Sequence, residues 1–449
     1  MVPVHGSTAP PARATRPPSR TGRAGPTRRG LLRAAAGGAT AALLGAGCSA
    51  GGGDRDHITW AIGLDPVGGP HFQRAAQEFM DRNPGVTIEL TPAPNGDLNA
   101  WLVTRLAADR APDIVNMGVS AVGRYTTNGG TVDIRDQLPD GFLDHYQPSL
   151  RALVEKDGGV FGIPHETNCA ATYYRTDILR RIGVEPRNDL ERAWTAEEIR
   201  EIAVEAKRVT GAYGLSWGYI NESSGNRWLP VLYMFGGSLF REDGRTPAIG
   251  DPEGIDALEW TRRLYADELI PASNTVKASQ EDTAFSLFTT GQVGLMIHES
   301  QFRSLKDVIP DEDWSVDHLF RERGAATNLS GSVNVVTRSS RNPELAAEFL
   351  AFASAPERIL ARVRESGAIA PYTGVTARDV GYAYRPDLVQ RFIDQLSTVP
   401  PQMAREQAGP DYQAIRQLLG DFLDLMFIGS ASARETADAI AEGLRNVRN

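Results

Sequence analysis

The stretch HITWAIGLDPVGGPHFQRAAQEFMDRNPGVTIEL, residues 57–90, decides the fold class of this chain. Residues 58–62 alternate apolar and other side chains, a period of two that is typical of a β-strand. After a glycine- and proline-rich turn, the apolar residues of 72–80 recur at the spacing of one helix face. Residues 83–85 (Asn-Pro-Gly) end that helix, and 86–90 alternate again as a strand. The stretch predicts a β-α-β unit.

The same alternation continues beyond this unit. An apolar helical stripe runs over 98–106, and 112–115 begin a third short strand. Helix starts follow further along, with a capping box at Thr195 and capping side chains predicted at Asp251 and Asn342. Helices that alternate with strands predict an α/β fold built on a mostly parallel sheet.

Residues 1–47 have the pattern of an export signal. Arg28 and Arg29 precede an apolar run too short to span a membrane, which indicates a twin-arginine signal. Small residues lead to Cys48, a candidate lipidation site, and 48–56 read as a flexible tether. The alternative is an alanine-rich disordered leader. With the signal, the mature protein is predicted to lie outside the cytoplasmic membrane, anchored to its outer face.

Charge and cysteine content narrow the function classes. The formal net charge is −9, and because residues 1–47 hold seven arginines and no acidic residue, the remainder carries −16. Such an acidic body argues against nucleic-acid binding. Cys169 is the single cysteine besides Cys48, so no internal disulfide is expected within the body. About 400 residues are too many for one small core and predict two lobes.

Five segments, in this order, resemble the sugar-binding family of extracellular solute-binding proteins that serve ABC importers, which includes maltose- and multiple-sugar-binding proteins. Each is a strand end, a cap or a helix stripe, and the resemblance that they carry extends over roughly residues 57–445. They are FMDRNPGV (79–86), LAADRAPDIV (106–115), FGIP with YYRTD (161–164 and 173–177), FSLF with GQVGLM (285–288 and 291–296), and NPELAAEFL (342–350).

The resemblance implies a two-lobe clamp with discontinuous lobes and a hinge. One lobe is expected to hold 57–164 plus 326–373, and the other 165–325 plus 374–449. Closure around a ligand would bury it between the lobes. The resemblance implies that the protein binds a carbohydrate ligand and the membrane permease subunits, without a cofactor. The chain is expected to be a monomer.

Loops at the carboxyl ends of strands supply the first candidate ligand contacts. Asp65 lies in the turn after the first strand, and Ser120 follows the third. By the resemblance, Asn168 takes the carboxylate position of maltose-binding relatives. Glu166 lies two residues earlier on the same strand face. Short polar groups of this kind suit hydroxyl recognition.

Aromatic side chains supply the second set. Trp217, Tyr219 and Trp228 lie in a loop-rich stretch, and sugar C–H faces pack on aromatic faces. At least one of the two tryptophans is expected to belong to the core instead. The helical Trp260 is expected to be a packing residue.

The third set of candidate ligand contacts consists of polar residues beside two buried strands. His298 and Glu299 are predicted at the end of the strand 295–297, and Ser330 lies in a crossover loop before 333–336. Small residues there let backbone amides approach a ligand.

The sequence is compatible with two other classes of function. A glycosidase could use Asp65 with Glu166 or Glu299 as a carboxylate pair. However, no nucleophile motif is present, and the few histidines are not clustered as metal ligands. The same clamp could instead bind another small solute, such as a polyamine, a peptide or an opine. The leading hypothesis is a non-enzymatic carbohydrate-binding protein.

Overall fold

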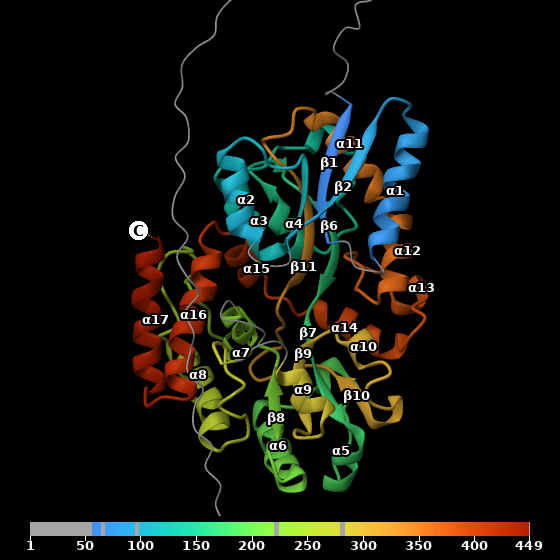
Figure 1. The fold of residues 1–449 in the computed structure, drawn as a ribbon. Coiled ribbons are helices and arrows are strands. Elements are labelled where there is room, and N and C mark those ends of the chain that lie inside the picture. Colours follow the sequence, from blue (N-terminus) through green and yellow to red (C-terminus); the bar gives the residue numbers. More distant parts are fainter. Residues whose placement is uncertain (1–55, 64–67, 95–97, 220–223, 279–282, 449) are drawn as a thin grey trace, which may run out of the picture. The chain divides into compact units, whose positions relative to one another are not determined.

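The computed structural model of the chain describes residues 56–63, 68–94, 98–219, 224–278 and 283–448. The predicted export signal, the predicted lipidation of Cys48 and the candidate Asp65 therefore lie outside the described residues. The described residues form two main β-sheets with helices packed against each of them (Figure 1).

The first sheet has five strands. Strands β1, β2 and β3 pair in parallel, and β11 runs antiparallel to both β3 and β6. The observed order β1, α1, β2, α2, β3 confirms the predicted β-α-β-α-β alternation. The sheet order is β2 (Thr87–Pro92), β1 (His57–Ile62), β3 (Ile114–Gly118), β11 (Ser330–Val336), β6 (Ile163–Asn168).

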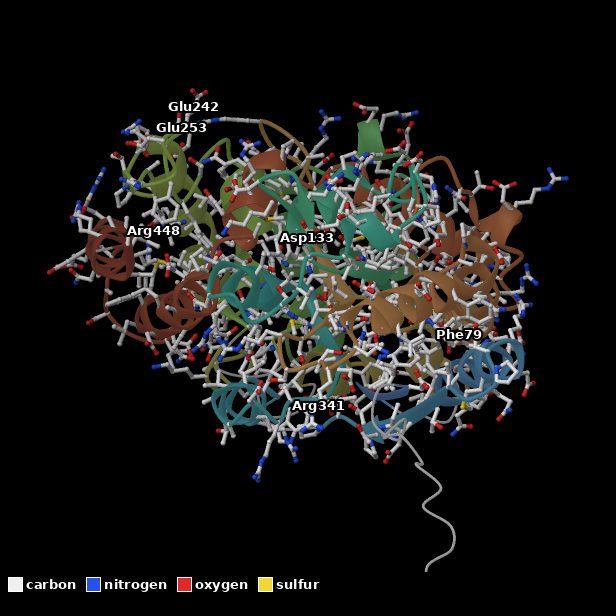
Figure 2. All side chains as sticks on the ribbon, turned by 90° about the horizontal axis from the view of Figure 1, so that it is seen from above. Phe79, Asp133, Glu242, Glu253, Arg341 and Arg448 are labelled. Atoms are coloured by element: carbon white, nitrogen blue, oxygen red, sulfur yellow. The ribbon has the colours of Figure 1, made fainter. Side chains whose placement is uncertain are left out.

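Aromatic side chains pack the helices against this sheet. Phe79 on α1 is labelled in Figure 2. Its ring centroid lies 5.2 Å from that of Phe349 and 5.3 Å from that of Phe352. Trp60 contacts Phe72 edge-on at 5.1 Å, so the strand and the apolar helix stripe meet as the periodicity predicts. The helices in contact with this sheet are α1 (Gly68–Arg82), α3 (Val119–Thr127), α4 (Pro148–Val154), α11 (Pro343–Ala353) and α12 (Pro356–Ser366).

The second sheet has four strands, of which only β8 and β9 pair in parallel. Its order is β10 (Trp314–Asp317), β7 (Ala170–Arg175), β9 (Leu295–Glu299), β8 (Leu215–Trp217). The helices in contact with it are α5 (Thr176–Ile182), α6 (Ala196–Thr210), α9 (Thr283–Thr289) and α14 (Pro386–Leu396). The parallel pairing that the alternation predicts therefore holds for β1–β3 in the first sheet and for β8 with β9 in the second. The other pairings are antiparallel, because β6, β7 and β11 enter by crossovers rather than by β-α-β turns.

The remaining elements lie around these layers. Helix α15 contacts α4 and α3, while α16 contacts α3, η3 and α17, so the C-terminal helices join segments that are far apart in the chain. These elements are α2 (Leu98–Ala107), η1 (Arg135–Gln137), β4 (Glu155–Lys156), β5 (Gly159–Val160), η2 (Leu190–Arg192), η3 (Gly225–Trp228), α7 (Leu229–Met234), α8 (Pro252–Ala266), α10 (Phe302–Leu305), η4 (Asp311–Asp313), α13 (Ala377–Val380), α15 (Pro401–Gln407), α16 (Tyr412–Phe427) and α17 (Ala433–Arg448).

The predicted caps have mixed outcomes. Asn342 caps α11 through Leu345 N at 3.4 Å, as predicted. The side-chain cap at Asp251 is wrong, because its carboxylate pairs instead with Arg241 at 2.9 Å. The predicted capping box at Thr195 is confirmed: Thr195 Oγ1 accepts from Glu198 N, and Glu198 Oε2 accepts from Thr195 N at 2.8 Å.

Thr195→Ala is expected to lower the free energy of unfolding by about 1 kcal/mol, because it leaves a helix N–H without its side-chain acceptor. Urea unfolding measures the change. Thr104→Ala on α2 is the matched control, since Thr104 bonds back to Ala100 O and does not cap a terminus. An equal effect of the two substitutions would contradict the assignment of the cap.

Three further observations concern membrane-spanning helices, Cys169 and Trp260. None of the helices in the described segments has the length and apolar content to cross a membrane. Cys169 is buried as a free thiol, and Trp260 is buried with its indole N–H bonded to Ala196 O at 3.1 Å, as its predicted packing role requires.

Candidate functional site

The chain changes from the first sheet to the second at Cys169, between β6 and β7. This falls later than the lobe boundary expected after residue 164. Asn168 Oδ1 accepts from Cys169 N at 2.9 Å and from Ser300 N at 3.1 Å. The predicted ligand contact Asn168 therefore uses its amide oxygen to fix the crossover against the end of β9.

A second segment crosses beside the first. Ala170 N donates to Asn328 Oδ1 at 2.8 Å, and Ser330 pairs with Asn168 at the start of β11. Gly331 has φ +127°, and a Cβ there would fall 2.4 Å from Glu166 O, so the close approach of these strands requires glycine. Ser330 thus begins β11 rather than lying in a loop before it.

A narrow crevice opens where these crossovers meet β8 and β9. Trp217, at the end of β8, lines it and is 3% exposed. The other lining residues are Ala170, Gly218, Arg227, Ile297, His298, Glu299 and Asn328. The structure therefore brings three predicted site residues, Trp217, His298 and Glu299, to one place.

Glu299 is the charged centre of this crevice. Its Oε1 accepts from Asn328 Nδ2 at 2.8 Å, and its Oε2 accepts from Arg227 Nη2 at 3.0 Å. The side chains of Arg227 and Glu299 are only 15% and 14% exposed, so both charges have lost most of their contact with water. Each charge is therefore stabilised by the other.

His298 lies within β9 rather than after it, which corrects the predicted end of that strand. Its Nδ1 is 3.1 Å from both Gln301 Nε2 and Glu299 O. A Cβ on Gly218 would fall 2.5 Å from the ring, so glycine lets the loop after β8 pass over His298.

Arg416 on α16 connects this region to the first sheet's helices. Its Nη1 donates to Ser120 Oγ at 2.9 Å on α3, and its Nε donates to Asn226 Oδ1 at 3.0 Å in η3. Burial lowers the pKa of Arg416, and neighbouring Arg227 lowers it further, while Glu299 opposes both effects. The predicted site residue Ser120 therefore lies at a contact between α3 and the C-terminal helices, within the same polar region.

A second polar cluster surrounds Glu166 on β6. Arg362 Nη2 donates to Glu166 Oε2, and Ser332 Oγ donates to Oε1 at 3.2 Å. Burial alone would raise the pKa of Glu166, but the Arg362 cation, His165 and the two hydrogen bonds outweigh it and lower the pKa to about 2. Burial and the same cation lower the pKa of His165 to about 3, so this imidazole is neutral at physiological pH.

Two predicted aromatic contacts are core residues in this structure. Trp228 is fully buried, with its indole N–H bonded to Thr261 Oγ1 at 2.9 Å. Tyr219 is 1% exposed between Trp217 and Phe427. This corrects the expectation that both rings face a ligand, and it agrees with the expectation that one tryptophan packs in the core.

Three arginines of these clusters, Arg227, Arg362 and Arg416, were not among the predicted site residues. Arg227 is adjacent to Trp228 in the stretch that supplied the aromatic candidates, so its position was a usable signal. Arg362 and Arg416 lie on amphipathic helices, where an arginine is usually solvated, and no local pattern distinguishes them. Among the described residues, no group of three or more His, Cys, Asp or Glu side chains is arranged to hold a metal ion.

Comparison with known proteins assigns this architecture to a family. The bacterial extracellular solute-binding protein family matches residues 74–388. The lactose-binding protein of Rhizobium radiobacter is 24% identical over 351 residues, covering 73% of this chain and 79% of that protein. The chain belongs to the bacterial extracellular solute-binding proteins.

Solved structures show the same fold. The cyclic α-maltosyl-1,6-maltose binding protein of Arthrobacter globiformis superposes with a TM-score of 0.74 at 20% identity, covering 87% of this chain and 98% of that one. An ABC transporter solute-binding protein of Thermotoga lettingae TMO, bound with α-D-tagatose, gives 0.73 at 20% identity, covering 88% and 100%. The fold is the two-lobe clamp with discontinuous lobes and a hinge, as expected.

Proposed function

We propose that this protein captures a carbohydrate between its two lobes, releases it unaltered and delivers it to an ABC importer. The observation that carries the proposal is the crevice at the crossovers, where Trp217 lies beside the carboxylate of Glu299 and the amide of Asn328. An aromatic face with acceptors and donors at its edge is the combination that a sugar ring requires. The relatives named for lactose and for maltosyl sugars support the same ligand class.

The charges of the region favour a neutral ligand. The carboxylates of Glu166 and Glu299 are both paired with buried or nearly buried arginines. Each carboxylate already has a cationic partner, which a polyamine would have to displace, whereas a polyhydroxylated ligand has both donors and acceptors within reach.

The glycosidase alternative is disfavoured by the state of Glu166. The general acid of the pair needs a raised pKa, whereas Arg362 and Ser332 hold the pKa of Glu166 at about 2, so Glu166 cannot supply the acid. We propose that the protein is a binder without catalytic turnover.

The proposal extends to the remaining parts of the chain. We propose the two lobes implied by the resemblance, 57–164 plus 326–373 and 165–325 plus 374–449, with the first boundary moved to Cys169, just after β6 ends, and with the crossovers between the lobes as the hinge. Export through the predicted signal and lipidation at Cys48 would hold a monomer at the outer face of the membrane, beside the permease subunits. Ligand contacts from both lobes would favour the closed clamp that the permease recognises.

Calorimetry and thermal shift with lactose, maltose, arabino-oligosaccharides, putrescine and a short peptide test this function. We expect binding of a saccharide and none of putrescine. Trp217→Phe is expected to weaken that binding about tenfold, because a smaller ring covers less of the sugar and the indole N–H is lost. Trp228→Phe is the matched control in the core. Equal affinities of the two variants would remove Trp217 from the site, and hydrolysis of the sugar would overturn the binding function.

A further inference from the structure

The crevice beside Trp217 has the chemistry of a sugar subsite without the room for one. It encloses about 10 Å³, roughly the space that one water molecule needs, whereas ligand pockets enclose about 300–1,000 Å³. Trp217 is 3% exposed, so its ring is covered in this conformation. Tyr219 stacks on the indole of Trp217 with the ring centroids 6.3 Å apart, and another side chain of the protein occupies the polar side of the crevice.

That side chain is Arg227. Its Nη1 donates to Gly218 O and its Nη2 donates to Glu299 Oε2, so the guanidinium spans from the loop after β8 to the end of β9. Its own backbone oxygen accepts from Trp217 Nε1 at 3.3 Å, which fixes the base of the arginine beside the indole. The guanidinium presents two N–H groups to two acceptors, much as two hydroxyl groups of a sugar would.

We propose that Arg227 is an internal plug of the ligand site: its guanidinium occupies the polar side of the crevice, between Gly218 O and Glu299, and leaves when a saccharide enters. This inference rests on the proposed function. The entering ring takes over two acceptors, Gly218 O and Glu299 Oε2, with two hydroxyl donors, while Asn328 keeps its bond to Oε1.

The carboxylate of Glu299, which remains when Arg227 moves away, decides which sugars can bind. Once Arg227 has moved into solvent, Glu299 still interacts with the cation of Arg416, so its carboxylate is not left without a neighbouring positive charge. A neutral hydroxylated ring can therefore replace the guanidinium. A sugar acid cannot, because its carboxylate would face Glu299 across the acceptors that it must satisfy. The subsite takes an uncharged sugar ring and excludes a uronate.

Because the ligand must first displace Arg227, only the fraction of molecules with an open subsite can bind it, and the apparent affinity of the wild type for the saccharide is lowered. Arg227→Met keeps the aliphatic stem and the backbone acceptor of Trp217 but makes neither polar contact. We expect this variant to bind the saccharide about tenfold more tightly than wild type, with Arg227→Lys between the two. Arg241→Met, on the exposed pair with Asp251, is the matched control and should leave the affinity unchanged.

Acrylamide quenching of tryptophan fluorescence tests the plug without any ligand. Arg227→Met should raise the quenching severalfold, and the rise should vanish in the double variant with Trp217→Phe. Unchanged quenching, or a loss of saccharide affinity in Arg227→Met, would overturn the plug and make Arg227 a structural residue or a direct ligand contact. Increased quenching with no saccharide bound by any variant would leave the plug standing and refute carbohydrate binding. Glucuronate and glucose, compared as probes, test the exclusion of acidic rings.

Discussion

Replacing Arg362 with leucine is expected to lower the free energy of unfolding by about 3 kcal/mol at pH 7, the lower end of the range for breaking a buried ion pair. Arg362 on α12 is 7% exposed and donates to the Glu166 carboxylate. Its guanidinium also lies over the Phe72 ring, 5.5 Å from the ring centroid. Leucine leaves Glu166 charged and partly buried without its cation. The 30% exposure of Glu166 keeps the loss from being larger.

The same substitution should change how stability depends on pH. The pKa of Glu166 is about 2 in the folded state against 4.5 for the free group. A lowered pKa stabilises the fold above about pH 4.5, and this contribution is lost as the pH falls from 4.5 toward 2. Without Arg362 the pKa of Glu166 rises, so that loss should disappear.

Urea unfolding at pH 7, 4.5 and 3 measures both effects. Arg358→Leu is the control on the same helix, because its pair with Glu78 is more exposed, and it should cost about 1 kcal/mol or less. A loss in Arg362→Leu no larger than in this control would contradict a structural role for the Glu166 cluster.

The helices and strands follow from local sequence wherever a local rule determines them. Residues 57–90 contain both periods, two and 3.6, and the structure forms β1, α1 and β2 there. The capping box at Thr195 needs only residues three apart. Asp251 shows the limit of such a rule, because an arginine brought close by the fold, Arg241, takes its carboxylate.

The site is less accessible to local reasoning because its contacts join distant parts of the chain. Glu299 meets Arg227 across 72 positions, and Arg416 meets Ser120 across 296. Sequence reasoning selected Glu299 and Ser120 from their places at element ends, but nothing local specifies their arginine partners. Trp217 and Trp228 are both buried and both donate their indole N–H within the fold, and only the place of Trp217 on the crevice separates the two rings.

Glu406→Gln is expected to raise the free energy of unfolding by about 2–3 kcal/mol at pH 8 and to leave it nearly unchanged at pH 4.5. Glu406 on α15 is 5% exposed, and Tyr233 OH donates to its Oε2 at 2.6 Å. Burial raises its pKa to about 7, although Tyr233, Gln402 and Arg448 all oppose the rise. A buried carboxylate at pH 8 must therefore be ionised at a cost that glutamine avoids.

The sign is opposite to that of Glu166. A folded-state pKa above the free value of 4.5 favours the protonated folded form, so stability is greatest below pH 4.5 and falls as the pH rises from 4.5 to about 7. Glutamine keeps a carbonyl acceptor for Tyr233 and carries no charge, so this fall should be absent from the variant. Urea unfolding at pH 4.5 and 8 measures the difference, with Glu201→Gln on the exposed face of α6 as the control. A wild-type stability that does not fall between these pH values, or a variant that is less stable than wild type at pH 8, would show that Tyr233, Gln402 and Arg448 together hold Glu406 as a carboxylate. In that case α15 would be fixed by hydrogen bonds to a carboxylate rather than by a protonated acid.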